Sequence, residues 1–395
     1  MKQVIYPSLI LLTLFSSTVN AVELSGNISL QSQAFFNDPL DPNQHNQYSS
    51  FAVQPELYQK SDNSRQSMTF IAFHRHDHND EERSHSDIRE LSWTGVYDGF
   101  EITAGISKVF WGVTETQHLV DIINQTDQVE GIDGEDKLGQ PMIRFSTEQN
   151  WGVLDMFILP GFRERTFTGI EGRPRFEIAP GLNFNADTAT YESDKEEKHI
   201  DYATRWLGIF DEIELGLSYF TGTSREPTMV LNGTTLSPHY LLIKQIGIDV
   251  QAIIEDWTWK LEAVSRKSSA DNYIATTAGF EYTLYGIFGG DSDLGIVIEY
   301  LYDDRNDLAS SPFQNDITTA LRLALNDTQS TEILLGLTTD LDDSVIASFI
   351  EASRRLGDSL KLTLEARAFN NTISSRPLHN FRQDNFVQAD LAWYF

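Results

Sequence analysis

Charged side chains at every second position of apolar segments are the residues of this sequence best placed for chemistry. In residues 257–264, Lys260 and Glu262 alternate with Trp257 and Trp259. Successive side chains of a strand point to opposite faces, so these charges share one face. The same pattern predicts an inward charged face made of Glu214, Asp249, Lys260, Glu262, Glu281, Glu299, Arg322, Lys361, Glu365, Arg367 and Asp390.

These charges need either water or one another. A charge that faces lipid at the bilayer midplane costs about 2–4 kcal/mol, so they must face an enclosed interior if the apolar face meets lipid. They line either an aqueous lumen that sorts solutes by size and charge, or a salt-bridge lattice that plugs the interior. A barrel of about eighteen strands usually encloses an aqueous channel, which favours the lumen.

The segment 108–139 is too apolar for a freely solvated loop, and 116–126 within it predicts a short helix. Long loops in compact proteins are usually functional or disordered. The segment therefore either folds into the interior as a constriction or packs over its mouth. Its apolar residues are Val109, Phe110, Trp111, Leu119, Val120, Ile122 and Ile123. Its end is strongly acidic, with Asp121, Asp127, Glu130, Asp133, Glu135 and Asp136. Of these, Asp121, Asp127, Glu130 and Asp133 are candidate selectivity residues.

Four arginines lie in the next long connection, within PGFRERTFTGIEGRPRF. They are Arg163, Arg165, Arg173 and Arg175. An arginine can bind carboxylate or phosphate with two parallel hydrogen bonds. Beside the acidic segment, these arginines form either the opposed charged face of a constriction or simple ion pairs with nearby acids.

Three histidines alternate in HRHDHND, and a fourth follows closely. His74, His76 and His78 point to the same side of an extended segment, and His85 is the neighbour. Histidine is a common metal ligand, so the three are candidates for zinc or copper. The alternative is a set of solvent-exposed histidines on an acidic rim, because no closed four-ligand spacing accompanies them.

No catalytic motif is recognisable. The sequence has many serines and nine histidines but neither G-x-S-x-G nor H-E-x-x-H. A hydrolase needs a nucleophile, a base and an orienting group in one place. We therefore expect a protein that is not an enzyme and that needs no cofactor.

Period-two alternation recurs along the chain and predicts eighteen strands. Their centres lie near residues 31, 54, 71, 92, 104, 143, 155, 202, 216, 247, 262, 279, 298, 321, 335, 349, 365 and 390. Alternate connections are long (37–48, 77–85, 108–139, 160–197, 221–238, 267–272, 303–314 and 370–384), except for the short 340–343. The others, such as Asp98-Gly99, are mostly short. Long loops on one side and short turns on the other are the signature of a transmembrane barrel.

Composition restricts the partners and the compartment. Lys+Arg is 29 against Asp+Glu 58, a formal net charge of −29, which excludes a nucleic-acid footprint. Acidic outer loops suit divalent cations shared with lipopolysaccharide. Residues 1–21 read as a cleaved signal peptide, with one domain over 22–395. The absence of cysteine leaves stability to strand closure or a large core.

These features resemble the outer-membrane porin-like barrels of Gram-negative bacteria. The resemblance is carried by the signal peptide, the paired strands and the end Trp393-Tyr394-Phe395. It implies recognition of Phe395 by the barrel assembly machinery and a surrounding of outer-membrane lipid. Phe110-Trp111-Gly112 followed by Asp121-Ile122-Ile123-Asn124-Gln125 is similar to a segment of barrels that resemble hydrophobic-compound or polysaccharide channels; no binding residue is carried over from that match.

The sequence thus predicts an all-β, transmembrane, antiparallel up-and-down barrel of about 18 (16–18) strands in the cell outer membrane. Its expected function is passive or facilitated diffusion of small solutes, with cationic and neutral solutes favoured. The alternatives are a plugged barrel acting as a structural protein or adhesin, and a channel for hydrophobic or polysaccharide substrates. The candidate selectivity residues are Asp121, Asp127, Glu130 and Asp133 of the acidic end and the four arginines, together with Lys260, Glu262, Glu299, Arg322, Lys361 and Arg367.

Overall fold

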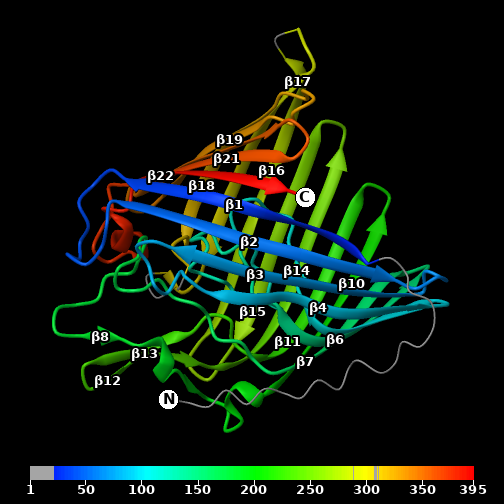
Figure 1. The fold of residues 1–395 in the computed structure, drawn as a ribbon, viewed down its shortest axis with the longest axis horizontal. Helices are drawn as coiled ribbons and strands as arrows, with labels where there is room; N and C mark the ends of the chain where they lie inside the picture. Colours follow the sequence, from blue (N-terminus) through cyan, green and yellow to red (C-terminus); the bar gives the residue numbers. More distant parts are fainter. Residues whose placement is uncertain (1–21, 288, 307–308, 310) are drawn as a thin grey trace.

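A computed structural model describes residues 22–395 of the chain except 288, 307, 308 and 310. The predicted signal peptide, 1–21, lies outside the described residues. Eighteen long strands of the described chain form one sheet (Figure 1). In chain order they are β1 (Glu23–Phe35), β2 (Gln47–Lys60), β3 (Gln66–Asp77), β4 (Ser86–Tyr97), β5 (Phe100–Ser107), β6 (Gln140–Gln149), β7 (Gly152–Pro160), β10 (Ile200–Phe210), β11 (Ile213–Thr223), β14 (Leu242–Ile254), β15 (Trp257–Lys267), β16 (Asn272–Ile287), β17 (Ser292–Asp303), β18 (Asn315–Ala324), β19 (Glu332–Asp340), β20 (Ile346–Leu356), β21 (Leu360–Asn370) and β22 (Phe386–Tyr394).

The sheet closes on itself because the last strand pairs with the first. β22 lies antiparallel to β1, with Leu391 opposite Leu30, and every other neighbouring pair is antiparallel as well. Closure leaves no free sheet edge, which a backbone in lipid requires. All eighteen predicted strand centres lie within these strands, so the predicted fold class is confirmed.

The outward face of the sheet is apolar and the inward face is polar. On β15, Trp259 is 47% exposed on the outside, whereas Glu262 on the inside of the same strand is 0% exposed. This alternation is the pattern of a barrel whose outer wall meets lipid. Exposed aromatic rings gather near the end of the barrel that carries the short turns: Tyr97, Trp151, Phe210, Trp257, Tyr285, Trp393, Tyr394 and Phe395. Such rings prefer a membrane–water interface.

The opposite end of the barrel carries the long loops, and two of them build a small second sheet that the sequence did not predict. Short strands from the connections after β7 and β11 pair there (Figure 1). They are β8 (Asn183–Phe184), β9 (Thr190–Tyr191), β12 (Thr228–Asn232) and β13 (Thr235–Tyr240), with the 3₁₀ helices η1 (Ala186–Thr188) and η2 (Glu196–Lys198) between them. Another 3₁₀ helix, η4 (Pro377–Phe381), precedes β22. No helix among the described residues is long and apolar enough to cross a membrane.

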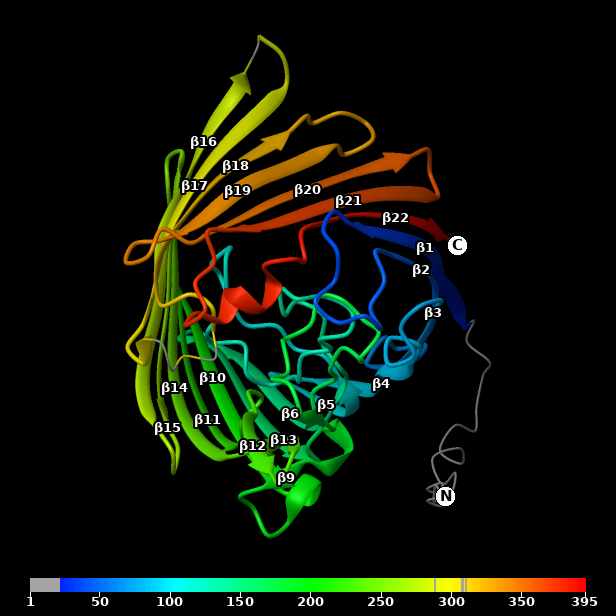
Figure 2. The ribbon, with the colours of Figure 1, turned by 90° about the vertical axis from the view of Figure 1, so that its left-hand side faces the viewer.

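The connection between β5 and β6, residues 108–139, lies inside the barrel rather than over its mouth. Figure 2 shows long-loop segments filling much of the enclosed space. Val120 and Ile123 of the connection are 0% exposed and pack with Trp111 against wall residues of β6, β7, β10, β11, β14, β15 and β16. Of the two arrangements left open by the sequence, the infolded loop is therefore the one observed. We call residues 108–139 the infolded loop.

The helix predicted over 116–126 is absent from the described chain, and this prediction was wrong. Residues 116–126 contain turns, bends, unassigned residues and, at Thr126, an isolated antiparallel bridge to Lys137. One physical reason is that the wall carboxylate of Glu262 accepts the backbone N–H of Val120, which in a helix would bond to the carbonyl of Thr116. Tertiary contacts of this kind override a weak local helix propensity.

Candidate functional site

Two buried wall carboxylates hold the infolded loop in place. Glu262 of β15 accepts backbone N–H bonds from Val113 (2.7 Å) and Thr114 (3.0 Å) through Oε1, and from Val120 (3.2 Å) through Oε2. Glu299 of β17 is also 0% exposed. Hydrogen bonds to a charged acceptor are worth about 1.5–3 kcal/mol each. Both residues were predicted to line the lumen, but they serve as anchors of the loop.

Glu299 anchors the neighbouring stretch in the same way. Its Oε1 accepts the backbone N–H of Glu115 (2.7 Å), and its Oε2 accepts the N–H (2.8 Å) and the hydroxyl (2.7 Å) of Thr116. A glycine in the wall makes room for the loop. A Cβ atom added at Gly247 would lie 3.0 Å from Val120 Cγ1 and 2.5 Å from Ser218 Oγ.

A protonated histidine adds charge to these anchors. His118 lies 3.6 Å from Glu135 and 3.8 Å from Glu262. Burial lowers the pKa of His118, but the nearby carboxylates of Glu135 and Glu262 outweigh burial and raise that pKa to about 9. Gly112 is needed beside this ring, because its φ is +155° and an added Cβ atom would lie 2.7 Å from His118 Nδ1.

The acidic end of the infolded loop is paired with arginines of the wall that the sequence analysis did not single out. Arg89 of β4 donates to Asp127 Oδ2 at 2.6 Å, and Arg75 of β3 donates to both oxygens of Glu130. Burial raises the pKa of Asp127, but His85 and Arg89 overcome this and lower it to about 2. The inward position of Arg75 could have been inferred from HRHDHND, because Arg75 alternates with the histidines and so lies on the opposite face of the strand.

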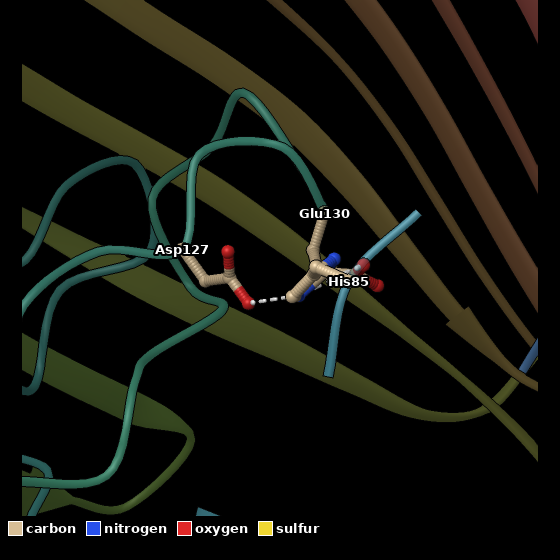
Figure 3. Close-up of side chains that lie close together, drawn as sticks. All are labelled: His85, Asp127 and Glu130. Carbon is tan, nitrogen blue, oxygen red and sulfur yellow. Dashed lines mark hydrogen bonds and ion pairs between the residues drawn. The ribbon is translucent and has the colours of Figure 1, made fainter. Parts of the chain in front are cut away.

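His85, Asp127 and Glu130 form the one group in the described part of the chain with metal-binding distances (Figure 3). His85 Nε2 lies 3.2 Å from Asp127 Oδ2. Because Arg89 and Arg75 already neutralise the two carboxylates, the group is an ion-pair network that joins the loop to β3 and β4. The predicted metal candidates His74, His76 and His78 are exposed and have the opposite parity to buried Arg75 and Asp77, which places them on the outward face of β3.

The four arginines of the connection after β7 do not form a common face toward the acidic end. Arg163 pairs with Asp87 at 2.7 Å, and Arg173 pairs with Asp384 at 2.8 Å. Arg163 and Arg173 therefore form ion pairs with acids, which is the second of the two roles considered from the sequence. The Nε atoms of Arg165 and Arg175 have no hydrogen-bond partner within the described residues.

The remaining candidates differ in whether they contact the infolded loop. Arg322 and Lys260 approach Glu115 of the infolded loop at 2.5 Å and 3.9 Å. Asp121 lies within the loop, 3.1 Å from Lys137, and burial raises its pKa. Lys361 lies near the short turns, where its strand begins.

Arg367 of β21 lies beside a cavity of about 290 Å³. The cavity separates the infolded loop from the wall formed by β19–β21. On the loop side it is lined by Glu115, Thr116, Gln117, His118, Ile132, Asp133 and Glu135, and on the wall side by Leu334, Thr338, Ala347, Phe349, Glu351, Arg367 and Phe369. Asp133 and Arg367 are thus the two predicted residues that face open space together, 3.5 Å apart.

The fold and the site define a closed eighteen-stranded barrel with an anchored loop inside it. No family model and no curated protein matches the chain. In fold it is similar to solved bacterial porins. A mutant of the Rh. blastica porin shares 12% identity, with 95% of this chain and 100% of that chain covered and a TM-score of 0.45. A triple mutant of the Rhodopseudomonas blastica porin shares 11% identity over the same coverage, with a TM-score of 0.44.

Proposed function

We propose that this protein is an outer-membrane channel for passive or facilitated diffusion of small solutes. The observation that carries the proposal is the asymmetric filling of the barrel. The buried apolar residues of the infolded loop pack against β6, β7, β10, β11 and β14–β16, whereas the cavity of about 290 Å³ remains between the loop and β19–β21. We place the solute path along this second side.

The outer wall supports the membrane location. Large apolar side chains are exposed on the outward face of most strands, for example Leu30 (62%), Ile246 (62%) and Leu335 (47%). Leaving such a surface in water is costly, at about 25 cal/mol per Å² of apolar area, and lipid removes that cost. Together with the aromatic rings near the short turns, this wall suits a bilayer of ordinary thickness.

Charge supports a preference for cations at the mouth. The formal net charge is −29, and the acids of the long loops surround the entrance. These acids would also hold divalent cations shared with lipopolysaccharide.

A plugged barrel with a structural or adhesive role is the second candidate. It is favoured by the buried ion pairs that tie the loops to the wall, such as Arg75–Glu130 and Arg89–Asp127. Each of these ion pairs fixes loop residues inside the barrel and so fills part of the interior. In this case the cavity beside β19–β21 would not connect the two ends of the barrel.

The purified, refolded protein should conduct ions across a planar lipid bilayer. We expect discrete current steps and, under a potassium chloride gradient, a reversal potential that indicates cation preference. The cation preference should weaken as the salt concentration rises, because the Debye length falls to about 10 Å at 0.1 M and the charges of the acidic loops are then screened. Absence of conductance would support the plugged barrel, and anion preference that persists at low salt would contradict the charge argument.

A further inference from the structure

The cavity beside β19–β21 has an apolar, aromatic side. Phe349 of β20 and Phe369 of β21 line it from the wall, and Leu378 and Phe381 of η4 line it from the long-loop end. Leu334 of β19 completes this surface. Because this surface faces a charged lumen, it provides a place for the apolar body of a small solute. At about 290 Å³ the cavity is at the lower end of the range of about 300–1,000 Å³ that is usual for small-molecule sites.

The same cavity has an excess of carboxylates. Arg367 donates to Glu365 (2.7 Å) and Glu351 (2.7 Å) and lies 3.5 Å from Asp133. Three carboxylates thus surround one guanidinium. On the opposite side, Glu115 is paired with Arg322 and Glu135 with His118. Two negative charges therefore remain unbalanced in the cluster around Arg367, of whose three carboxylates Glu351 and Asp133 line the cavity and Glu365 does not.

Arg367 itself shows how a cation fits this surface. Its guanidinium lies 5.6 Å from the centroid of the Phe349 ring while it binds the surrounding carboxylates. A cation within about 6 Å of an aromatic centroid is attracted by the ring. The remaining carboxylate charge and the neighbouring phenylalanine faces offer the same combination to a solute.

We propose that this cavity is a binding site for organic cations with an apolar body, such as arylalkylammonium compounds. The proposal rests on the channel function, because it places the site on the solute path. An anionic analogue would meet the excess carboxylates. A neutral analogue would gain the apolar contact alone, and a small alkylammonium ion would gain the charge alone. The site therefore selects for both properties in one molecule.

Block of potassium current by phenethylammonium tests this site. We expect phenethylammonium to reduce the current through the wild-type channel at concentrations about tenfold or more below those needed for 2-phenylethanol or ethylammonium, since tenfold in affinity corresponds to one lost interaction of about 1.4 kcal/mol. Glu351→Gln and Asp133→Asn should each weaken the block by about the same factor. Asp133 lies in the loop, so its variant does not alter a strand.

Glu214→Gln is the matched control, because Glu214 lies on the inward face of β11 and its carboxylate has no hydrogen bond or ion pair within the described residues. Its block should equal that of the wild type. Equal potency of phenethylammonium and 2-phenylethanol, or unchanged block in both Glu351→Gln and Asp133→Asn, would overturn the site. Calorimetric titration of the detergent-solubilised protein separates the two proposals: binding without any current would support the site and overturn the channel.

Discussion

Removing the two wall carboxylates that anchor the infolded loop should open the barrel. In the double variant Glu262→Ala/Glu299→Ala, the backbone N–H groups of Val113, Thr114 and Thr116 lose their acceptors. Each buried donor left without a partner costs about 1–3 kcal/mol, so the loop should lose at least about 3 kcal/mol of docking energy. That corresponds to a roughly hundredfold shift of the docking equilibrium. We expect higher single-channel conductance, larger current fluctuations and faster proteolysis within 108–139.

The control for this experiment is Glu214→Gln, whose carboxylate lies on the inward face but holds no part of the loop. Its conductance and proteolysis should match the wild type. The barrel itself should remain closed in the double variant, because the strand pairing does not depend on these side chains; heat-modifiable migration in gels reports that directly. A double variant with wild-type conductance and an intact loop would show that the carboxylates do not anchor the loop.

Replacing Arg173 should detach the outer loops from one another. The Arg173 side chain is 0% exposed and donates to Asp384, to the carbonyls of Gln383 and Asn37, and to Asn46. It thereby ties the connection after β7 to the connections after β1 and β21. In Arg173→Ala, Asp384 remains buried without its partner, and breaking a buried pair in this way costs about 3–5 kcal/mol.

We expect rapid proteolysis of these loops in Arg173→Ala and a lower melting temperature, measured by circular dichroism. Arg65→Ala provides the comparison, because the Arg65–Asp98 pair is exposed (59% and 93%) and such pairs are worth about 0–1 kcal/mol. If both variants were equally stable and equally resistant to protease, the buried pair would not hold the loops together.

The barrel could be predicted from the sequence because its signal is repeated and local. Alternation along each strand, as in Trp257–Glu262, and the alternation of long and short connections depend only on the pleat and on the up-and-down topology. The strand order follows without any tertiary information. The small sheet formed by β8, β9, β12 and β13 could not be predicted, because two-residue strands carry no periodic signal.

The site was predicted only in part, because the residues that bond to one another in it are distant in the sequence. The parity of β15 and β17 correctly places Glu262 and Glu299 inside, but it cannot show that they bind the loop 142 to 184 residues earlier. The arginines after β7 were noticed as a cluster, yet Arg173 pairs with Asp384, which is 211 residues away. Such pairings are decided by three-dimensional packing and not by spacing.

Cysteine accessibility tests most directly whether a solute path runs between the infolded loop and β19–β21. The chain contains no cysteine, so single substitutions need no background removal. Ala347 lines the cavity, Ile350 of the same strand is 44% exposed on the outer wall, and Ala275 is 1% exposed beneath the loop. Each cysteine variant would be treated in a bilayer with a water-soluble, cationic methanethiosulfonate reagent while its current is recorded.

Current through Ala347→Cys should fall on addition of the reagent, while Ile350→Cys and Ala275→Cys keep their current. Current that is unchanged in Ala347→Cys but blocked in Ala275→Cys would contradict a solute path beside β19–β21, because ions would then pass on the side where the loop is packed against the wall.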